Sequence, residues 1–256
     1  MSKGFYTSVL SMAVAATFAA SAANASVVYN VSGPAAGDAE AAEQAFLAGL
    51  QDGYVTEDFE GFGAGTQQMS FDTAVGTFTG VTEGAGGSCD NMGFSCDAGL
   101  AVLDDATSPF TGRFAMPAGE NNNNWLDSMD YRESLFTLNP GYNSVGFFMT
   151  DPNDQGGIMD ILLGDSTSYT VSIDDIFGGS QPNEGAFYLS FYSDQGIESL
   201  TFLSNDPNDG YGIDNVTVGN QSVSVPEPGT IALLGLGLMG MFLAHRGRRQ
   251  KMPTAA

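Results

Sequence analysis

The feature that most constrains this fold is a series of short apolar or alternating segments, each bounded by turn residues, that begins at residue 55. In residues 187–192, for example, Phe and Leu alternate with Tyr and Ser. A period of two is typical of strands with one face in a core, and clusters of Gly, Asn, Asp and Pro are typical of the turns between them. The pattern excludes a helical bundle and predicts an all-β domain. We expect strands near residues 55–62, 68–72, 76–82, 111–116, 134–138, 144–150, 158–163, 168–173, 186–193, 197–203 and 212–218.

One helix is expected before these strands. Residues 38–50 are Ala-rich with an apolar edge near their end, Asp38 can cap the first turn, and Gly53 follows as a stop signal. One short N-terminal helix and a series of short strands predict a β-sandwich or jelly roll. Residues 83–109 and 117–131 are rich in Gly and Asn, so we expect long connections there.

The N-terminal end predicts a segment outside the folded domain. Lys3, a mostly apolar run over 9–20 and the small residues of 23–25 follow each other as the three parts of a secretory signal peptide. We therefore expect cleavage after Ala25. The alternative is a first core helix, but the segment is short and has no polar face.

The C-terminal end has three parts in a fixed order. Pro226-Glu227-Pro228 comes first, an apolar segment over 230–245 follows, and four basic residues within 246–251 close the chain. The apolar segment is near the lower length limit for a membrane helix, and the bases after it would stay in the cytoplasm. We expect the body to lie outside the cytoplasm. A plain membrane anchor is the alternative.

This order of parts resembles the PEP-CTERM sorting signal of bacterial exported proteins. The resemblance implies that the tail is a substrate of an exosortase, a membrane cysteine protease-transpeptidase. It also implies transient anchoring in the membrane through the C-terminal helix, then location at the cell surface or outside the cell, with extracellular polysaccharide as a partner. The predicted organisation is a leader at 1–25, an ectodomain at 26–218, a linker at 219–225 and a sorting signal at 226–251.

Three pieces of the body resemble the jelly-roll ectodomains that often precede this signal. Residues 56–62, 145–148 and 209–216 look like the first, a central and the last strand of such a domain. The resemblance implies binding to sugar or matrix, and in some members a structural calcium ion.

The charge balance restricts the partners of this body. Residues 26–225 hold 29 of the 30 acidic residues but only two of the seven basic ones, Arg113 and Arg132. Such a body repels phosphates, so we predict no nucleic-acid partner. It also repels itself unless cations, high salt or a spread of the charge over the surface offsets the repulsion.

A metal site is one way to offset this charge. Asp58 and Glu60 belong to the expected first strand, whereas Asp209 and Asp214 lie at the start of the last one. Neighbouring first and last strands would bring these carboxylates together, and clustered carboxylates are costly without a cation. We hypothesise one structural Ca²⁺ at this place. Solvated carboxylates in ordinary turns are the alternative.

The sequence Asp-Pro-Asn-Asp occurs twice, at 151–154 and at 206–209, each time after an expected strand. These loops offer the oxygen ligands that hard cations prefer. Neither copy fits the EF-hand pattern, because Leu162 stands at the twelfth position of the first and Gly210 comes one residue early in the second. Ordinary turns are again the alternative.

Two further pairs of residues suggest specific roles. Trp125 follows four consecutive Asn residues, and Tyr131 is nearby. An aromatic ring on a loop can stack on a sugar, so this pair is a candidate ligand platform, unless Trp125 packs the loop onto the core. Cys89 and Cys96 are the only cysteines, and export places them in an oxidising compartment, so we expect a disulfide.

The sequence does not predict an enzyme. His245, the only histidine, lies at the end of the apolar C-terminal segment, so the body lacks a Ser–His or Cys–His nucleophile. We predict a non-catalytic protein associated with extracellular polysaccharide or biofilm matrix. A purely structural envelope protein and a glycan hydrolase that uses paired carboxylates are the alternatives.

Overall fold

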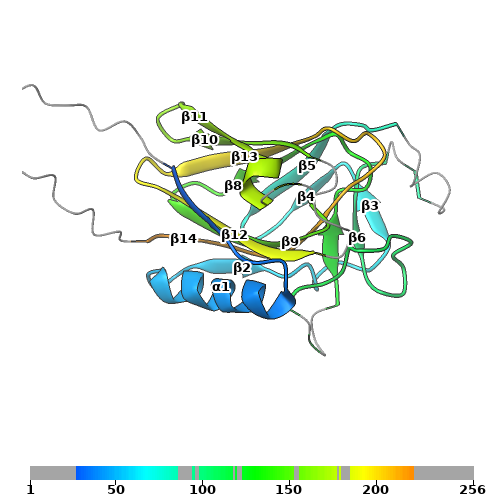
Figure 1. The fold of residues 1–256 in the computed structure, drawn as a ribbon, viewed down its shortest axis with the longest axis horizontal. Coiled ribbons are helices and arrows are strands. Elements are labelled where there is room, and N and C mark those ends of the chain that lie inside the picture. Colours follow the sequence, from blue (N-terminus) through cyan, green and yellow to red (C-terminus); the bar gives the residue numbers. More distant parts are fainter. Residues whose placement is uncertain are drawn as a thin grey trace, which may run out of the picture.

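A computed structural model describes residues 27–85, 94–95, 98–117, 119, 123–152, 156–177, 179 and 185–221. Within these residues the chain forms two antiparallel sheets and two helices (Figure 1). The strands are β1 (Val27–Val31), β2 (Val55–Glu57), β3 (Thr66–Gln68), β4 (Ser70–Asp72), β5 (Gly76–Thr82), β6 (Leu100–Leu103), β7 (Trp125–Asp127), β8 (Glu133–Leu138), β9 (Ser144–Thr150), β10 (Gly157–Leu163), β11 (Ser168–Ser172), β12 (Ala186–Ser193), β13 (Ile197–Ser204) and β14 (Gly212–Gly219). The helices are α1 (Ala36–Gly49) and α2 (Ile173–Phe177).

The strands from β7 to β14 have the connectivity of a jelly roll. They pair as a nested set, β7 with β14, β8 with β13, β9 with β12, and β10 with β11. The larger sheet has the order β1-β12-β9-β14-β7-β6-β3, with β2 also on β14, and the smaller has the order β11-β10-β13-β8-β5-β4. A nested antiparallel ribbon that wraps across two sheets is a jelly roll. The prediction of a β-sandwich is therefore confirmed for the described residues.

The expected pairing of the segment that begins at residue 55 with the last strand is also confirmed, and β9 is the other neighbour of that strand. Val218 of β14 lies opposite Val55 of β2 on one side and opposite Val145 of β9 on the other. The three pieces that resemble jelly-roll ectodomains therefore contribute adjacent strands of one sheet.

The core lies between the two sheets and is rich in Phe. Phe147 of β9 packs against Phe191 and Phe202, with ring centroids 6.2 and 5.9 Å apart. Phe78 of β5 stacks on Phe136 of β8 at 4.1 Å. Aromatic pairs in these arrangements add directional attraction to the apolar area that they bury.

Helix α1 covers the outer face of the larger sheet (Figure 1). The predicted helix is confirmed, but it begins at Ala36, so Asp38 lies in its first turn. Phe46 packs against Tyr188 of β12, which in turn packs against Phe148 of β9. Because β9 has α1 on one side and the sandwich core on the other, every residue of this strand is buried.

The structure differs from the predictions in the long connections. Residues 111–116 do not form the expected strand, whereas β6 and β7 lie in the two segments expected to be connections. Every residue of β6 and β7 is buried. Strand β1 and helix α2 were also not expected. These elements are too short for their periodicity to separate them from loops, and only tertiary packing stabilises them.

The two ends of the described chain lie at the same end of the sandwich (Figure 1). Val27 pairs with Ser193, the last residue of β12, and Gln221 contacts Asn143 in the turn before β9. We call this end, with its turns at 51–54, 139–143, 164–167, 194–196 and 219–221, the proximal end. The distal end carries the turns at 128–132, 151–152 and 205–211.

The predicted leader and sorting signal lie outside the described residues. Within the part of the chain that the structure describes, no helix is long and apolar enough to cross a membrane.

Candidate functional site

At the distal end, a buried arginine is surrounded by three aspartates. Arg113 is 5% exposed. Its Nη1 donates to Asp127 Oδ1 at 2.9 Å, its Nη2 donates to Asp209 Oδ1 at 2.6 Å, and its Nε lies 4.0 Å from Asp151 Oδ2. The Phe110 ring lies against the guanidinium at 4.2 Å from its centroid. We call Arg113, Asp127, Asp151 and Asp209 the Arg113 cluster.

Asp151 and Asp209, one from each Asp-Pro-Asn-Asp sequence, meet at this cluster. Asp151, the first residue of one copy, follows β9, and Asp209, the last residue of the other, precedes β14. Both of these residues lie at the distal end, and both carboxylates reach Arg113. Asp151 has a φ of 59°, a region that short polar residues tolerate. A Cβ on Gly112 would lie 2.8 Å from the Asp151 carboxylate, so glycine allows this close approach.

Asp127 is the most buried carboxylate of the cluster. Besides Arg113, it accepts hydrogen bonds from Trp125 Nε1 at 3.1 Å and from the Met129 amide at 2.8 Å. Burial raises the pKa of Asp127, while the Arg113 charge and these donors oppose the shift. The cluster therefore joins strand β7 to the Asp209 loop by charge-assisted hydrogen bonds, and Asp151 adds an ion pair. Its arrangement is that of a structural clamp.

The predicted ligand platform is not formed. Trp125 and Tyr131 are both buried, at 0% and 1% exposed. Trp125 donates to Asp127, and the Tyr131 hydroxyl donates to Met69 Sδ at 3.2 Å. Neither ring can stack on a sugar from these positions. The alternative, that Trp125 packs its segment onto the core, describes the structure.

The first two predicted calcium ligands, Asp58 and Glu60, accept hydrogen bonds from backbone amides. Phe59 has a φ of 56°, and this turn carries the chain away from β14 directly after β2. Glu60 Oε1 then accepts hydrogen bonds from the amides of Asn123 and Asn124 at 2.6 and 2.7 Å. Asp58 Oδ1 accepts the Glu60 amide at 3.1 Å. Asp58 thus stabilises its own turn, whereas Glu60 joins that turn to the segment before β7.

The other two predicted ligands also have protein partners. Asp214 is buried, and its two carboxylate oxygens accept the amides of Met116 and Asn215 at 2.8 and 2.7 Å. Asp209 belongs to the Arg113 cluster. Among the described residues, no three acidic, His or Cys side chains are placed so that they could hold a metal ion. Calcium binding to the chain stays a prediction, without a site formed by these four carboxylates.

Two further sets of predicted residues cannot be placed. Cys89 and Cys96 lie outside the described residues, as does the sorting motif Pro226-Glu227-Pro228.

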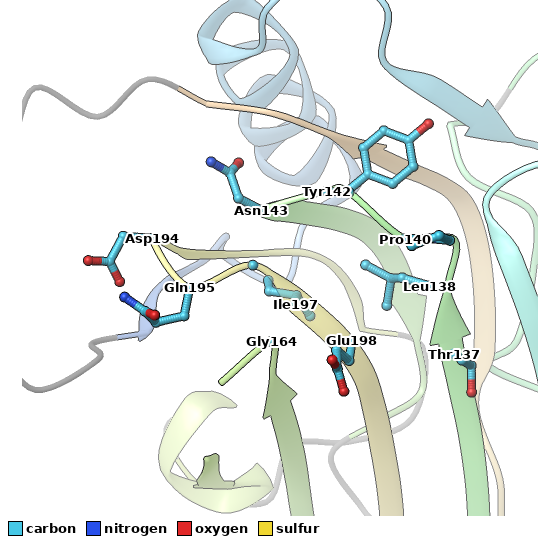
Figure 2. Close-up of a pocket in the computed structure, with 12 residues that line it drawn as sticks. Thr137, Leu138, Pro140, Tyr142, Asn143, Gly164, Asp194, Gln195, Ile197 and Glu198 are labelled. Carbon is cyan, nitrogen blue, oxygen red and sulfur yellow. The ribbon is translucent and has the colours of Figure 1, made fainter. Parts of the chain in front are cut away.

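A groove of about 550 Å³ opens at the proximal end (Figure 2). Figure 2 shows Leu138 and Ile197 at its centre, with Asp194, Gln195 and Glu198 around them. The Asp194 and Glu198 side chains point in different directions. This arrangement does not favour a hydrolase, in which two carboxyl groups face each other across the substrate. An apolar floor with amides and carboxylates at its rim suits a ligand that has both C–H surfaces and hydroxyls.

Comparison with known proteins identifies the tail. Residues 224–249 match the family described as the PEP-CTERM protein-sorting motif. The chain therefore carries this motif, as its sequence predicted. The motif marks an exported protein that an exosortase recognises. The chain matches no curated protein at a significant level.

Three solved structures share a weak likeness with the body. The K2 cleaved adhesin domain of Lys-gingipain is 13% identical with a TM-score of 0.38, over 64% of this chain and 98% of that one. The Agl-KA catalytic domain is 12% identical with a TM-score of 0.30, over 70% of this chain and 31% of that one. The catalytic unit of the GH87 α-1,3-glucanase from Streptomyces thermodiastaticus is 13% identical with a TM-score of 0.26, over 50% and 27%. Likeness at this level carries no argument about function.

Proposed function

We propose that this protein, which carries a PEP-CTERM motif and so belongs among exported exosortase substrates, acts as a non-catalytic module that associates with extracellular polysaccharide or biofilm matrix. The observation that carries the proposal is the order of its parts, a jelly-roll body followed directly by the sorting motif at residues 224–249. The predicted leader directs the body out of the cytoplasm, and the motif marks it for the sorting enzyme. Polysaccharide is the polymer that the body meets there.

The proximal groove supports a glycan ligand. Leu138 and Ile197 are only 6% and 3% exposed and form the bottom of the groove, and the exposed Pro140 beside them offers the apolar surface against which the C–H face of a sugar can pack. Gln195 and Glu198 at the rim offer hydrogen-bonding groups for hydroxyls. The proposed site thus moves from Trp125 and Tyr131, which are buried, to this groove.

Binding to the extracellular polysaccharide of the producing bacterium tests the proposal. Residues 26–225 and their Gln195→Ala and Glu198→Ala variants are sedimented with the purified polymer, and Glu83→Ala serves as a control because Glu83 is exposed at the distal end. We expect the wild type and the control to sediment with the polymer and both groove variants to bind more weakly. Absence of wild-type binding would contradict the proposal.

The alternative is a purely structural envelope protein whose acidic surface interacts with cations and polymer without a discrete site. The observation in its favour is the charge of residues 26–225, with 29 acidic residues against two basic ones. Under this alternative, polymer binding depends on salt but is insensitive to single groove substitutions.

A structural calcium ion is the most specific part of the proposal. The excess of acidic over basic residues in 26–225 supports it. A calcium-dependent rise in the unfolding midpoint would indicate a discrete cation site linked to folding. No shift would leave the carboxylates as solvated turn residues.

A further inference from the structure

The chain leaves the body at a fixed point of the proximal end. Asn143 Oδ1 accepts the Gln221 amide at 2.8 Å, and Asn143 Nδ2 donates to the Gln221 carbonyl at 3.1 Å. The Gln51 amide donates to the Asn220 carbonyl at 2.8 Å, and Leu50 forms a β-bridge with Gln221. Asn143 also lines the proximal groove. The tail therefore starts beside the groove.

The distance from this point to the sorting motif is short. Only residues 222–225 separate Gln221 from Pro226. A fully extended chain spans at most about 3.6 Å per residue, so Pro226 lies within about 18 Å of Gln221. By the same reasoning, Thr230, where the predicted membrane segment begins, lies within about 32 Å. An enzyme that engages the motif must therefore approach the proximal end closely.

The proximal end carries only acidic charge within the described residues. Asp52, Asp165, Asp194 and Glu198 are exposed there. Both arginines of the described chain lie at the distal end: Arg113 in its cluster and Arg132 in the turn before β8. Anionic lipid headgroups would repel such a face, so a lipid surface does not suit it.

We propose that the proximal face, formed by Asp52, Asp165, Asp194, Glu198 and the groove between them, is a contact surface for the membrane-bound sorting enzyme. Its carboxylates meet a basic surface on the outer side of that enzyme. The short tether forces the two surfaces together, and complementary charge makes the contact favourable. The inference rests on the exported-substrate part of the proposed function. It also implies that the groove becomes accessible to polysaccharide only after the tail has been cut.

Processing of the full-length chain in a bacterium that has the sorting enzyme tests this surface. The proximal triple variant is Asp52→Asn, Asp194→Asn and Glu198→Gln. Its matched control is the distal triple variant Glu83→Gln, Asp174→Asn and Asp175→Asn, which removes the same charge from exposed positions at the other end. Both variants and the wild type are followed by pulse–chase, with the loss of the C-terminal tail as the readout.

We expect the proximal variant to be processed about three- to ten-fold more slowly than the wild type. The distal variant should match the wild type. A flexible Gly/Ser insertion of about 15 residues after Gln221 should reduce the difference, because it lowers the effective concentration of the body at the enzyme.

Equal processing of the proximal variant and the wild type would overturn the proposal. Equal slowing of both triple variants would also overturn it, because that result would reflect total charge or export. The exported-substrate premise has its own test, the variant Pro226→Ala with Pro228→Ala. If this variant is processed normally, the premise fails; if it is not processed but the triple variants are equal, only the contact surface fails.

Discussion

The Arg113 cluster makes the sharpest prediction about stability. In the variant Arg113→Met, the Met side chain replaces the buried aliphatic part of Arg113, and the positive charge is lost. Asp127 and Asp151 then stay buried without a cation, and leaving buried carboxylates without their ion-pair partner costs about 3–5 kcal/mol. Two features place the expected cost near the lower value. Asp127 keeps the donors Trp125 Nε1 and the Met129 amide, and the Asp209 side chain is 29% exposed and can be hydrated.

The assay is thermal unfolding of residues 26–225. For a domain of this size, each kcal/mol shifts the midpoint by roughly 2–4 °C, so a loss of about 3 kcal/mol lowers it by roughly 6–12 °C. Arg132→Met is the matched control, because Arg132 is the other arginine of the body and is exposed. We expect its effect to stay within about 0.5 kcal/mol.

A double variant tests the mechanism of this loss. Asp127→Asn removes the charge that Arg113 neutralises, so Arg113→Met should cost less in that background than in the wild type. Equal midpoints for Arg113→Met and Arg132→Met would refute the reasoning. Strictly additive costs in the double variant would show that Arg113 stabilises the body without its pairing to Asp127.

Three more predictions follow from single contacts. Gly112→Ala should cost about 1–3 kcal/mol in urea unfolding, because φ is +88° and the new Cβ meets Asp151, whereas Gly141→Ala, at φ +99° with open space around it, should cost less. Burial raises the pKa of Glu43, so its ionisation weakens the fold as pH rises from the group's ordinary value through its raised pKa. The thermal-unfolding midpoint of Glu43→Gln should therefore rise relative to that of the wild type between acid and neutral pH. The same substitution at the exposed Glu83 should give no such rise. If calcium is structural, excess calcium raises the wild-type midpoint and a chelator lowers it; equal midpoints would contradict that proposal.

The sequence predicts the parts of the fold whose pattern is long and regular. Residues 187–192 alternate, residues 197–203 place Leu200 and Phe202 two positions apart, and both segments form strands close to the expected bounds. Strands β6 and β7 are only short runs within Gly- and Asn-rich segments. Their pairing with each other and with β3 and β14 decides their structure. Such non-local contacts leave no periodic signal in the sequence.

The Arg113 cluster was not predicted from the sequence. The two Asp-Pro-Asn-Asp repeats indicated a cation site, and two of their carboxylates do meet a cation, the Arg113 guanidinium. The signal that could have found it is the presence of only two arginines among 29 acidic residues, because a lone base in such a body has many possible partners. The predicted pairing of Glu60 with Asp214 failed for a local reason. The positive φ of Phe59 turns the chain away, and no periodicity reveals that turn.

The intact mass of the protein released by a bacterium with the sorting enzyme tests the central claim most directly, that this is an exported jelly-roll body processed at its PEP-CTERM motif. We predict a mass without residues 1–25 and without the apolar segment 230–245, and a variant with Pro226→Ala and Pro228→Ala that keeps its tail in the cell. A released wild-type protein that still contains residues 230–245 would contradict the account.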